Sequence, residues 1–82
     1  MTETINAAPD KLLDTKGLTC PLPVLRAKKA IKDMQAGQVM KVLATDPGAV
    51  GDFAAFCQAT GNQLLASTTE DRTFVFLIKK SG

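Results

Sequence analysis

The 82-residue sequence predicts an α/β (α+β) two-layer sandwich, in which a four-stranded mixed sheet carries two helices on one face. Strand-like and helix-like segments follow one another in the order β-α-β-α-β-β. A strand–helix–strand unit is a right-handed crossover between parallel strands, and two strands joined by a short turn pair antiparallel. At this length the chain buries only the modest core of one domain.

The first part of the chain contains one strand and one helix. Residues 1–10 lack periodicity and predict a flexible N-terminal tail, followed by a single domain over residues 11–82. We expect a short strand over residues 11–14 and a helix over residues 23–35, which ends before Gly37. The helix is indicated by apolar residues at helical spacing: Val24, Ala27, Ile31 and Met34.

A second strand and a second helix follow. Residues 39–44 are rich in apolar and β-branched side chains, which predicts a strand. Asp46 is the expected N-cap of the next helix and Pro47 its first residue, because both residue types suit a helix start. Gly61 ends this helix, and its expected apolar stripe consists of Val50, Phe53, Ala54 and Cys57.

The chain closes with a predicted hairpin. Residues 63–68 and 73–79 have strand patterns, and residues 69–72 form the turn between them. Side chains alternate along the last strand, so we expect Val75 and Leu77 to point away from the helices. The sheet face that they share is then either a weak partner surface or an exposed apolar area that the protein tolerates. The side chains expected to face the helices are Phe74, Phe76 and Ile78.

Composition excludes several classes of site. The chain contains no histidine, which excludes Cys–His catalysis, Ser-His-Asp triads and histidine-based zinc sites. Its two cysteines are too few for a disulfide framework. No apolar run approaches the roughly 20 residues that span a bilayer, and residues 1–10 lack the features of a signal peptide. We therefore expect a cytoplasmic protein.

Cys20 is the candidate reactive residue. It directly precedes the first predicted helix, and a helix N-terminus stabilises an anion, which predicts a lowered thiol pKa. Arg26 and Lys28 are expected to add positive potential. Pro21 and Pro23 stiffen the segment and are expected to hold the sulfur outward.

Cys57 fits the alternative interpretation of a free cysteine, that of a small buried hydrophobe. It lies on the apolar stripe of the second helix, beside Phe56. Cys20 lies off any apolar stripe, so we expect it to be exposed. A redox pair between the two cysteines would require Cys57 to reach the surface.

Asp46 and the basic residues of the first helix can each be interpreted either structurally or as part of a site around Cys20. Asp46 follows the second strand and, because parallel strands end at the same sheet edge, it is either a neighbour of Cys20 or simply a helix cap. The basic residues of the first helix form either a solvated face or a surface that steers an acidic partner. We treat as candidate docking residues Arg26, Lys28, Lys29, Lys32 and Asp46.

Residues 13–25, LDTKGLTCPLPVL, closely resemble the opening of the TusA-like (SirA-like) sulfurtransferases, with their Cys-Pro-x-Pro signature. The resemblance continues through residues 34–37, the Asp46-Pro47 turn, Phe56-Cys57 and residues 77–80. It covers about residues 11–80. The domain over residues 11–82 is thus identified as TusA-like.

The resemblance implies the same β-α-β-α-β-β sandwich and the activity of a sulfurtransferase. Cys20 would accept sulfane sulfur as a persulfide from a cysteine desulfurase or a rhodanese-like donor and pass it to an acceptor protein, with no metal or other cofactor. Family members serve tRNA 2-thiouridine synthesis, sulfur oxidation or molybdenum-cofactor synthesis. Leu22 stands where the tRNA-thiolating member has an acidic residue.

Two other classes of protein remain as alternatives. The basic first helix is compatible with an RNA-binding module, although four phenylalanines without Trp or Tyr and a net charge of +2 make direct nucleic-acid binding unexpected. The chain is also compatible with a protein-binding regulatory module in which Cys20 is incidental.

Overall fold

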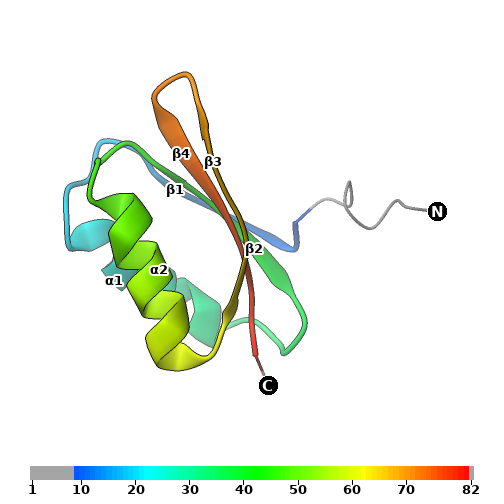
Figure 1. Ribbon diagram of the computed structural model, residues 1–82. Coiled ribbons are helices and arrows are strands. Elements are labelled where there is room, and N and C mark those ends of the chain that lie inside the picture. The colour runs from blue at the N-terminus through cyan, green and yellow to red at the C-terminus, as the bar shows by residue number, and fades with distance from the viewer. Residues whose placement is uncertain (1–8, 82) are drawn as a thin grey trace.

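The computed structural model describes residues 9–81, which form a sheet covered by two helices. The two helices lie side by side on one face of the sheet, and the other face is open (Figure 1). This arrangement confirms the predicted two-layer α/β sandwich. The elements in chain order are β1 (Lys11–Thr15), α1 (Leu22–Lys32), β2 (Val39–Ala44), α2 (Ala49–Thr60), β3 (Gln63–Glu70) and β4 (Thr73–Lys79).

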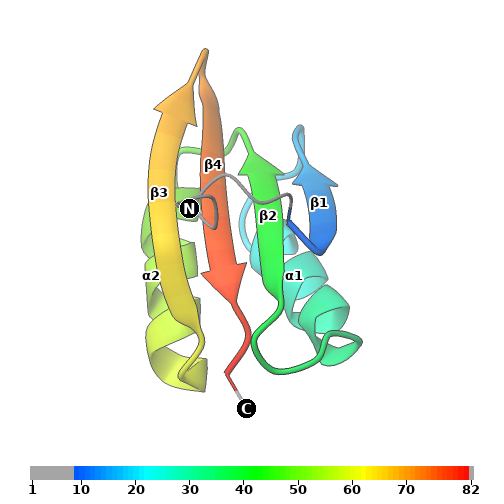
Figure 2. The same ribbon diagram turned by 90° about the vertical axis from the view of Figure 1, so that its right-hand side faces the viewer.

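The four strands lie in the order β1-β2-β4-β3, so that the two consecutive strands β1 and β2 form one half of the sheet (Figure 2). β1 and β2 are parallel, and the other two pairs are antiparallel. The sheet is therefore mixed, as predicted. β3 runs two residues further than expected, to Glu70, and Asp71 and Arg72 alone form the turn with φ values of 50° and 66°.

Helix α1 begins one residue before the predicted start and ends three residues before the predicted end. Its last turn tightens, since Met34 donates a backbone hydrogen bond to Ile31 three residues earlier. The amide of Gln35 then donates to Oε1 of Gln38 at 2.8 Å, which holds the chain in a turn in place of further helix. The predicted apolar stripe of α1 is buried or half-buried throughout.

Helix α2 differs from expectation at its start and in the phase of its buried face. Gly48, and not Asp46, occupies the N-cap position, because Asp46 Oδ2 accepts the Gly48 N–H in a turn before the helix. Val50 is 42% exposed and Ala54 is also exposed. The buried residues are Ala49, Phe53, Phe56 and Cys57, which also lie on one face of the helix, so the buried face is rotated relative to the predicted one.

Aromatic packing joins α2 to the middle of the sheet. Phe53 is fully buried and stacks on Phe76 of β4, with ring centroids 4.8 Å apart. Phe56 meets Phe53 edge-on at 6.4 Å. Phe76 and Ile78 are fully buried, which confirms that this side of β4 faces the helices. The packing fixes the position of α2, and with it one wall of the groove described below.

The open face of the sheet brings Val75 of β4 beside Leu43 of β2. Leu77, paired with Lys41, lies one step further along the same face. Leu12 on the edge strand β1 is 60% exposed. This face is apolar in its middle, as the alternation in β4 predicted, although Val75 itself is only 8% exposed.

The expected flexible tail, residues 1–10, falls outside the described residues except for its last two. Asp10 adjoins β1 and pairs with the start of β2. Its amide donates to the carbonyl of Val39 at 2.8 Å, and its Oδ2 accepts the Val39 N–H at 2.9 Å. Within residues 9–81, neither helix is long and apolar enough to cross a membrane.

Candidate functional site

The loop between β1 and α1 is held against the end of β2. Thr15 Oγ1 donates a hydrogen bond of 2.6 Å to the carbonyl of Leu43, and the Gly17 amide donates one of 3.0 Å to Thr45 Oγ1. Gly17 has a φ of 85°, a conformation that glycine adopts without steric cost. These contacts bring the loop that carries Cys20 beside the loop that leads into α2.

Cys20 lies at the start of α1 and is exposed, which confirms its expected accessibility. Pro21 occupies the N-cap position, and the Cys20–Pro21 peptide bond is cis. The amide of Leu22 donates to the carbonyl of Thr19 at 2.8 Å. Pro23 is buried and Pro21 is exposed, so that the prolines flanking the first helical residue have different environments.

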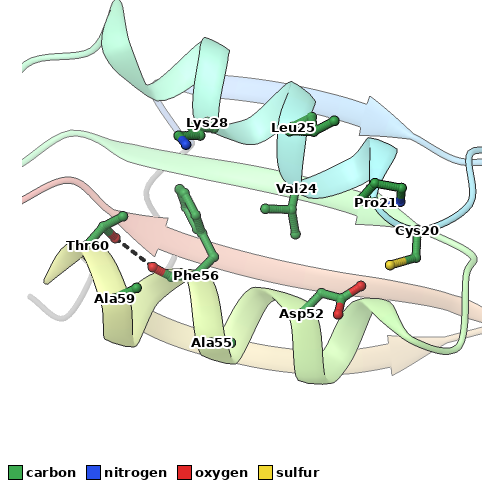
Figure 3. Close-up of a pocket in the computed structure, with 10 residues that line it drawn as sticks. All are labelled: Cys20, Pro21, Val24, Leu25, Lys28, Asp52, Ala55, Phe56, Ala59 and Thr60. Carbon is green, nitrogen blue, oxygen red and sulfur yellow. Dashed lines mark hydrogen bonds between the residues drawn. The ribbon is translucent and has the colours of Figure 1, made fainter.

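The sulfur lies at one end of an open groove between α1 and α2, with a volume of about 400 Å³ (Figure 3). Its walls are mainly apolar. Val24 and Leu25 come from α1, and Phe56 from α2. Lys28 lines the groove about two turns along α1, away from Cys20. The groove can therefore take an apolar segment that leads up to the sulfur.

Asp52 faces Cys20 from the opposite wall of the groove, and its carboxylate points toward the sulfur (Figure 3). The residue lies in the first turn of α2, where the helix N-terminus stabilises a negative charge. Sequence reasoning missed this residue. The available signal was its place in the first turn of a helix that follows β2, because β1 and β2 are parallel and deliver both helix N-termini to the same sheet edge.

The electrostatic environment of Cys20 is the reverse of the predicted one. Hydrogen bonding to the Asp52 carboxylate raises the pKa of the Cys20 thiol, and partial loss of hydration and the charges of Asp52 and Asp46 raise it further. We expected the helix N-terminus and nearby cations to lower this pKa. The carboxylates near the sulfur act against the partial positive charge of the helix end.

Asp46 lies near Cys20, as the parallel arrangement of β1 and β2 predicted, since its charge acts on the thiol. Its Oδ2 accepts the Gly48 amide at 3.1 Å. A Cβ atom on Gly48 would lie 3.1 Å from Asp46 Oδ2 and 3.8 Å from Asp52 Oδ2. The two carboxylates therefore flank the same residue, and of the two Asp52 lines the groove and makes its Cys20 end acidic.

The basic residues of α1 lie apart from the acidic end. Arg26, Lys28, Lys29 and Lys32 are all exposed. Of these, Lys28 is the one that lines the groove among the described residues. The groove consequently has an acidic end at Cys20, an apolar middle and a basic residue beyond it.

Cys57 is 5% exposed and packs in the core, which confirms the prediction that it is a buried cysteine. Burial raises the pKa of its thiol. Its helical neighbour Phe56 separates the core from the groove, lying 8% exposed with its ring toward the groove (Figure 3). Only Cys20 of the two cysteines is accessible to a partner.

The arrangement suits covalent chemistry on one exposed sulfur. Within residues 9–81, no group of three or more His, Cys, Asp or Glu side chains converges to hold a metal ion. An accessible cysteine beside an apolar groove can exchange sulfur with a cysteine of another protein, because thiol–disulfide chemistry requires access and a thiolate.

Comparisons with known proteins converge on one family. The family model described as sulfurtransferase TusA matches residues 11–80. The sulfur carrier protein TusA of Allochromatium vinosum is 58% identical over 72 residues, which cover 88% of this chain and 95% of that protein. A protein of Neisseria meningitidis serogroup A is 55% identical over 67 residues, covering 82% of this chain and 90% of the relative.

A solved structure has the same fold. The crystal structure of a SirA-like protein from Desulfitobacterium hafniense superposes with a TM-score of 0.77 at 26% sequence identity. The match covers 88% of this chain and 99% of the other.

Proposed function

This chain belongs to the TusA family of sulfurtransferases, and from that premise we propose that it carries sulfane sulfur as a persulfide on Cys20. The single observation that supports this role best is the exposed Cys20 at the end of an apolar groove. The relative from Allochromatium vinosum is named a sulfur carrier protein. We extend that role to this chain.

Loading is a nucleophilic exchange at sulfur. The Cys20 thiolate attacks the outer sulfur of a persulfide on the donor protein. A bond forms between Cys20 Sγ and that outer sulfur while the donor's sulfur–sulfur bond breaks, and the donor cysteine leaves as a thiolate. The sulfane sulfur changes carrier without net oxidation, so the step requires no metal or organic cofactor.

Unloading repeats the same exchange in the other direction. A thiolate of the acceptor protein attacks the outer sulfur on Cys20, and Cys20 leaves as the thiolate. The protein is then a stoichiometric carrier between two partners. The donor that we propose is a cysteine desulfurase or a rhodanese-like protein, and a reducing cytoplasm would keep unloaded Cys20 free for the next cycle.

The groove provides the surface on which a partner cysteine reaches Cys20. An attacking sulfur must approach along the donor's sulfur–sulfur axis, so the two proteins must be oriented as well as joined. Val24 and Leu25 on one side and Phe56 on the other offer apolar contact area along the groove that leads to the reacting sulfur. Pro21 lines the groove beside Cys20 and limits the backbone conformations available there.

The test is sulfur loading followed by intact-protein mass spectrometry. We expect wild type, incubated with a purified bacterial cysteine desulfurase and L-cysteine, to gain the mass of one sulfur atom, removable by a reductant. Cys20→Ser should gain none, whereas Cys57→Ala should load as wild type does. Loading of Cys20→Ser, or loss of loading in Cys57→Ala alone, would contradict the assignment of Cys20.

A further inference from the structure

We propose that Asp52 controls the charge on the Cys20 sulfur, and that a sulfur-exchange partner activates this sulfur by bringing a basic side chain against Asp52. The inference rests on the proposed function and adds a chemical requirement on the partner. It begins from geometry, because the Asp52 carboxylate points toward the sulfur from the opposite wall of the groove (Figure 3).

The two elements that bear these residues hold them together in the folded protein. Cys20 is fixed by the loop that Gly17 anchors on Thr45, and Asp52 is fixed in the first turn of α2. The stack of Phe53, the next residue, on Phe76 holds that turn on the sheet. The folded backbone therefore places the carboxylate and the sulfur on facing walls of the groove.

The charges around the sulfur are unbalanced. Asp52 faces it from α2, and Asp46 acts on it from the loop before α2. Lys28 lines the groove on α1 but lies about two turns away. The carboxylates favour the protonated thiol, and the pKa of Cys20 is raised accordingly. The free carrier thus presents a weakly nucleophilic sulfur, although that sulfur is exposed.

The same carboxylate has the opposite consequence once sulfur is bound. An alkyl persulfide is a stronger acid than the corresponding thiol, so the loaded residue forms an anion more readily. Its negative charge then lies near Asp52 and Asp46, where like charges repel. Repulsion favours release of the sulfane sulfur to an acceptor, and protonation of the free thiol follows. Asp52 thereby biases the carrier toward its unloaded state.

Loading then requires that the carboxylates be neutralised for the duration of the exchange. A Lys or Arg of the partner, placed beside its reactive cysteine, would pair with Asp52 and permit Cys20 to become a thiolate. The rest of the groove places further demands on the partner, because its middle is apolar and Lys28 lies beyond the middle. The fitting partner segment carries a basic residue at the sulfur, apolar residues next to it and an acidic residue further along.

The first part of the experiment measures the free carrier. Alkylation of Cys20 by iodoacetamide is followed against pH, with mass spectrometry at the Cys20 peptide. We expect Asp52→Asn to raise the rate at neutral pH by at least about twofold, because the reactive species is the thiolate. The rate profile should move to lower pH. Asp33→Asn, which changes net charge equally at the far end of α1, should follow wild type.

Added salt gives a readout that a structural role for Asp52 would not move. The screening length falls from about 10 Å at 0.1 M salt to about 3 Å at 1 M. Wild-type alkylation should therefore accelerate with salt, and Asp52→Asn should respond less. Asp46→Asn provides a second variant, for which we expect a smaller change in the same direction. Circular dichroism and thermal unfolding verify that each variant is folded.

The second part measures exchange with a protein. With a purified bacterial cysteine desulfurase and L-cysteine, Asp52→Asn should require at least about threefold more desulfurase for half-maximal loading, because a charge pair with the partner is lost. Faster alkylation together with a higher desulfurase concentration for half-maximal loading supports the proposal, while loading at saturating desulfurase should equal or exceed that of wild type, because Asn also removes the repulsion. An unchanged alkylation profile overturns the proposal, and half-maximal loading of Asp52→Asn at an equal or lower desulfurase concentration overturns the role of a basic partner residue.

These outcomes are separate from failure of the proposed function. If wild type accepts no sulfur, the carrier assignment fails while the alkylation profiles still decide whether Asp52 controls the sulfur. If wild type loads and Asp52→Asn matches it in both measurements, the carrier assignment stands and the inference fails.

Discussion

Replacement of Phe53 by alanine should remove a large share of the stability of this domain. Phe53 is fully buried and links α2 to β4 through its stack on Phe76 at 4.8 Å. Replacement of a core Phe by Ala costs about 3–5 kcal/mol of stability. Loss of an aromatic pair costs about 0.5–1.5 kcal/mol, and part of this cost is already included in that range. A domain of this size has a total stability of about 4–12 kcal/mol. We therefore expect a loss of about 4 kcal/mol.

The assay is urea unfolding followed by far-UV circular dichroism, since the chain has no Trp or Tyr for fluorescence. Val50→Ala on the exposed side of the same helix is the matched control, and its free energy of unfolding should change by less than about 0.5 kcal/mol. A loss below about 2 kcal/mol for Phe53→Ala would refute the reasoning, because it would mean that the core closes around the missing ring.

Three further changes test the fold around the site. The free energy of unfolding should fall as pH rises through about 9, because burial raises the pKa of the Cys57 thiol above that ordinary value and the unfolded chain loses the proton first. Cys57→Ala should make this fall with pH less steep in urea unfolding at several pH values. An equally steep fall in the variant would contradict the argument. Gly61→Ala should destabilise the domain by about 1 kcal/mol, because Gly61 has a φ of 82°. Gly51→Ala inside α2 should instead stabilise it by about 0.5–1 kcal/mol. Changes in thermal stability of the same sign for both variants would refute this argument from backbone conformation. Thr15→Val removes the 2.6 Å bond to the Leu43 carbonyl and should cost about 1 kcal/mol in urea unfolding, so an unchanged midpoint would show that this bond contributes nothing net.

Local patterns were sufficient to predict the order of elements and most of their bounds. β2 and β4 have the predicted limits because their apolar and β-branched residues are bounded by turn residues. The helix ends were predicted less well. Asp46 has the residue type of an N-cap, but its carboxylate accepts the Gly48 amide in a preceding turn, and only the path of the chain between β2 and α2 determines which of the two arrangements forms.

The sequence by itself determined that Cys20 would be the exposed sulfur and Cys57 the buried one. Each cysteine's relation to the nearest apolar stripe is a local property, and the absence of histidine is a matter of composition. The Cys-Pro-x-Pro segment indicates the family in the same way, because its residues are contiguous in the chain. These conclusions required no knowledge of which distant residues meet.

The charge environment of Cys20 was decided only by the tertiary structure. Local reasoning placed cations of α1 near the sulfur, because they are close in sequence. Asp52 is 32 positions away, yet the parallel β1–β2 pair and the Phe53–Phe76 stack bring its carboxylate to face the sulfur. Electrostatic interactions depend on distance in space and on exposure, so the sign of the pKa shift of Cys20 could be obtained only once the two helices were placed together.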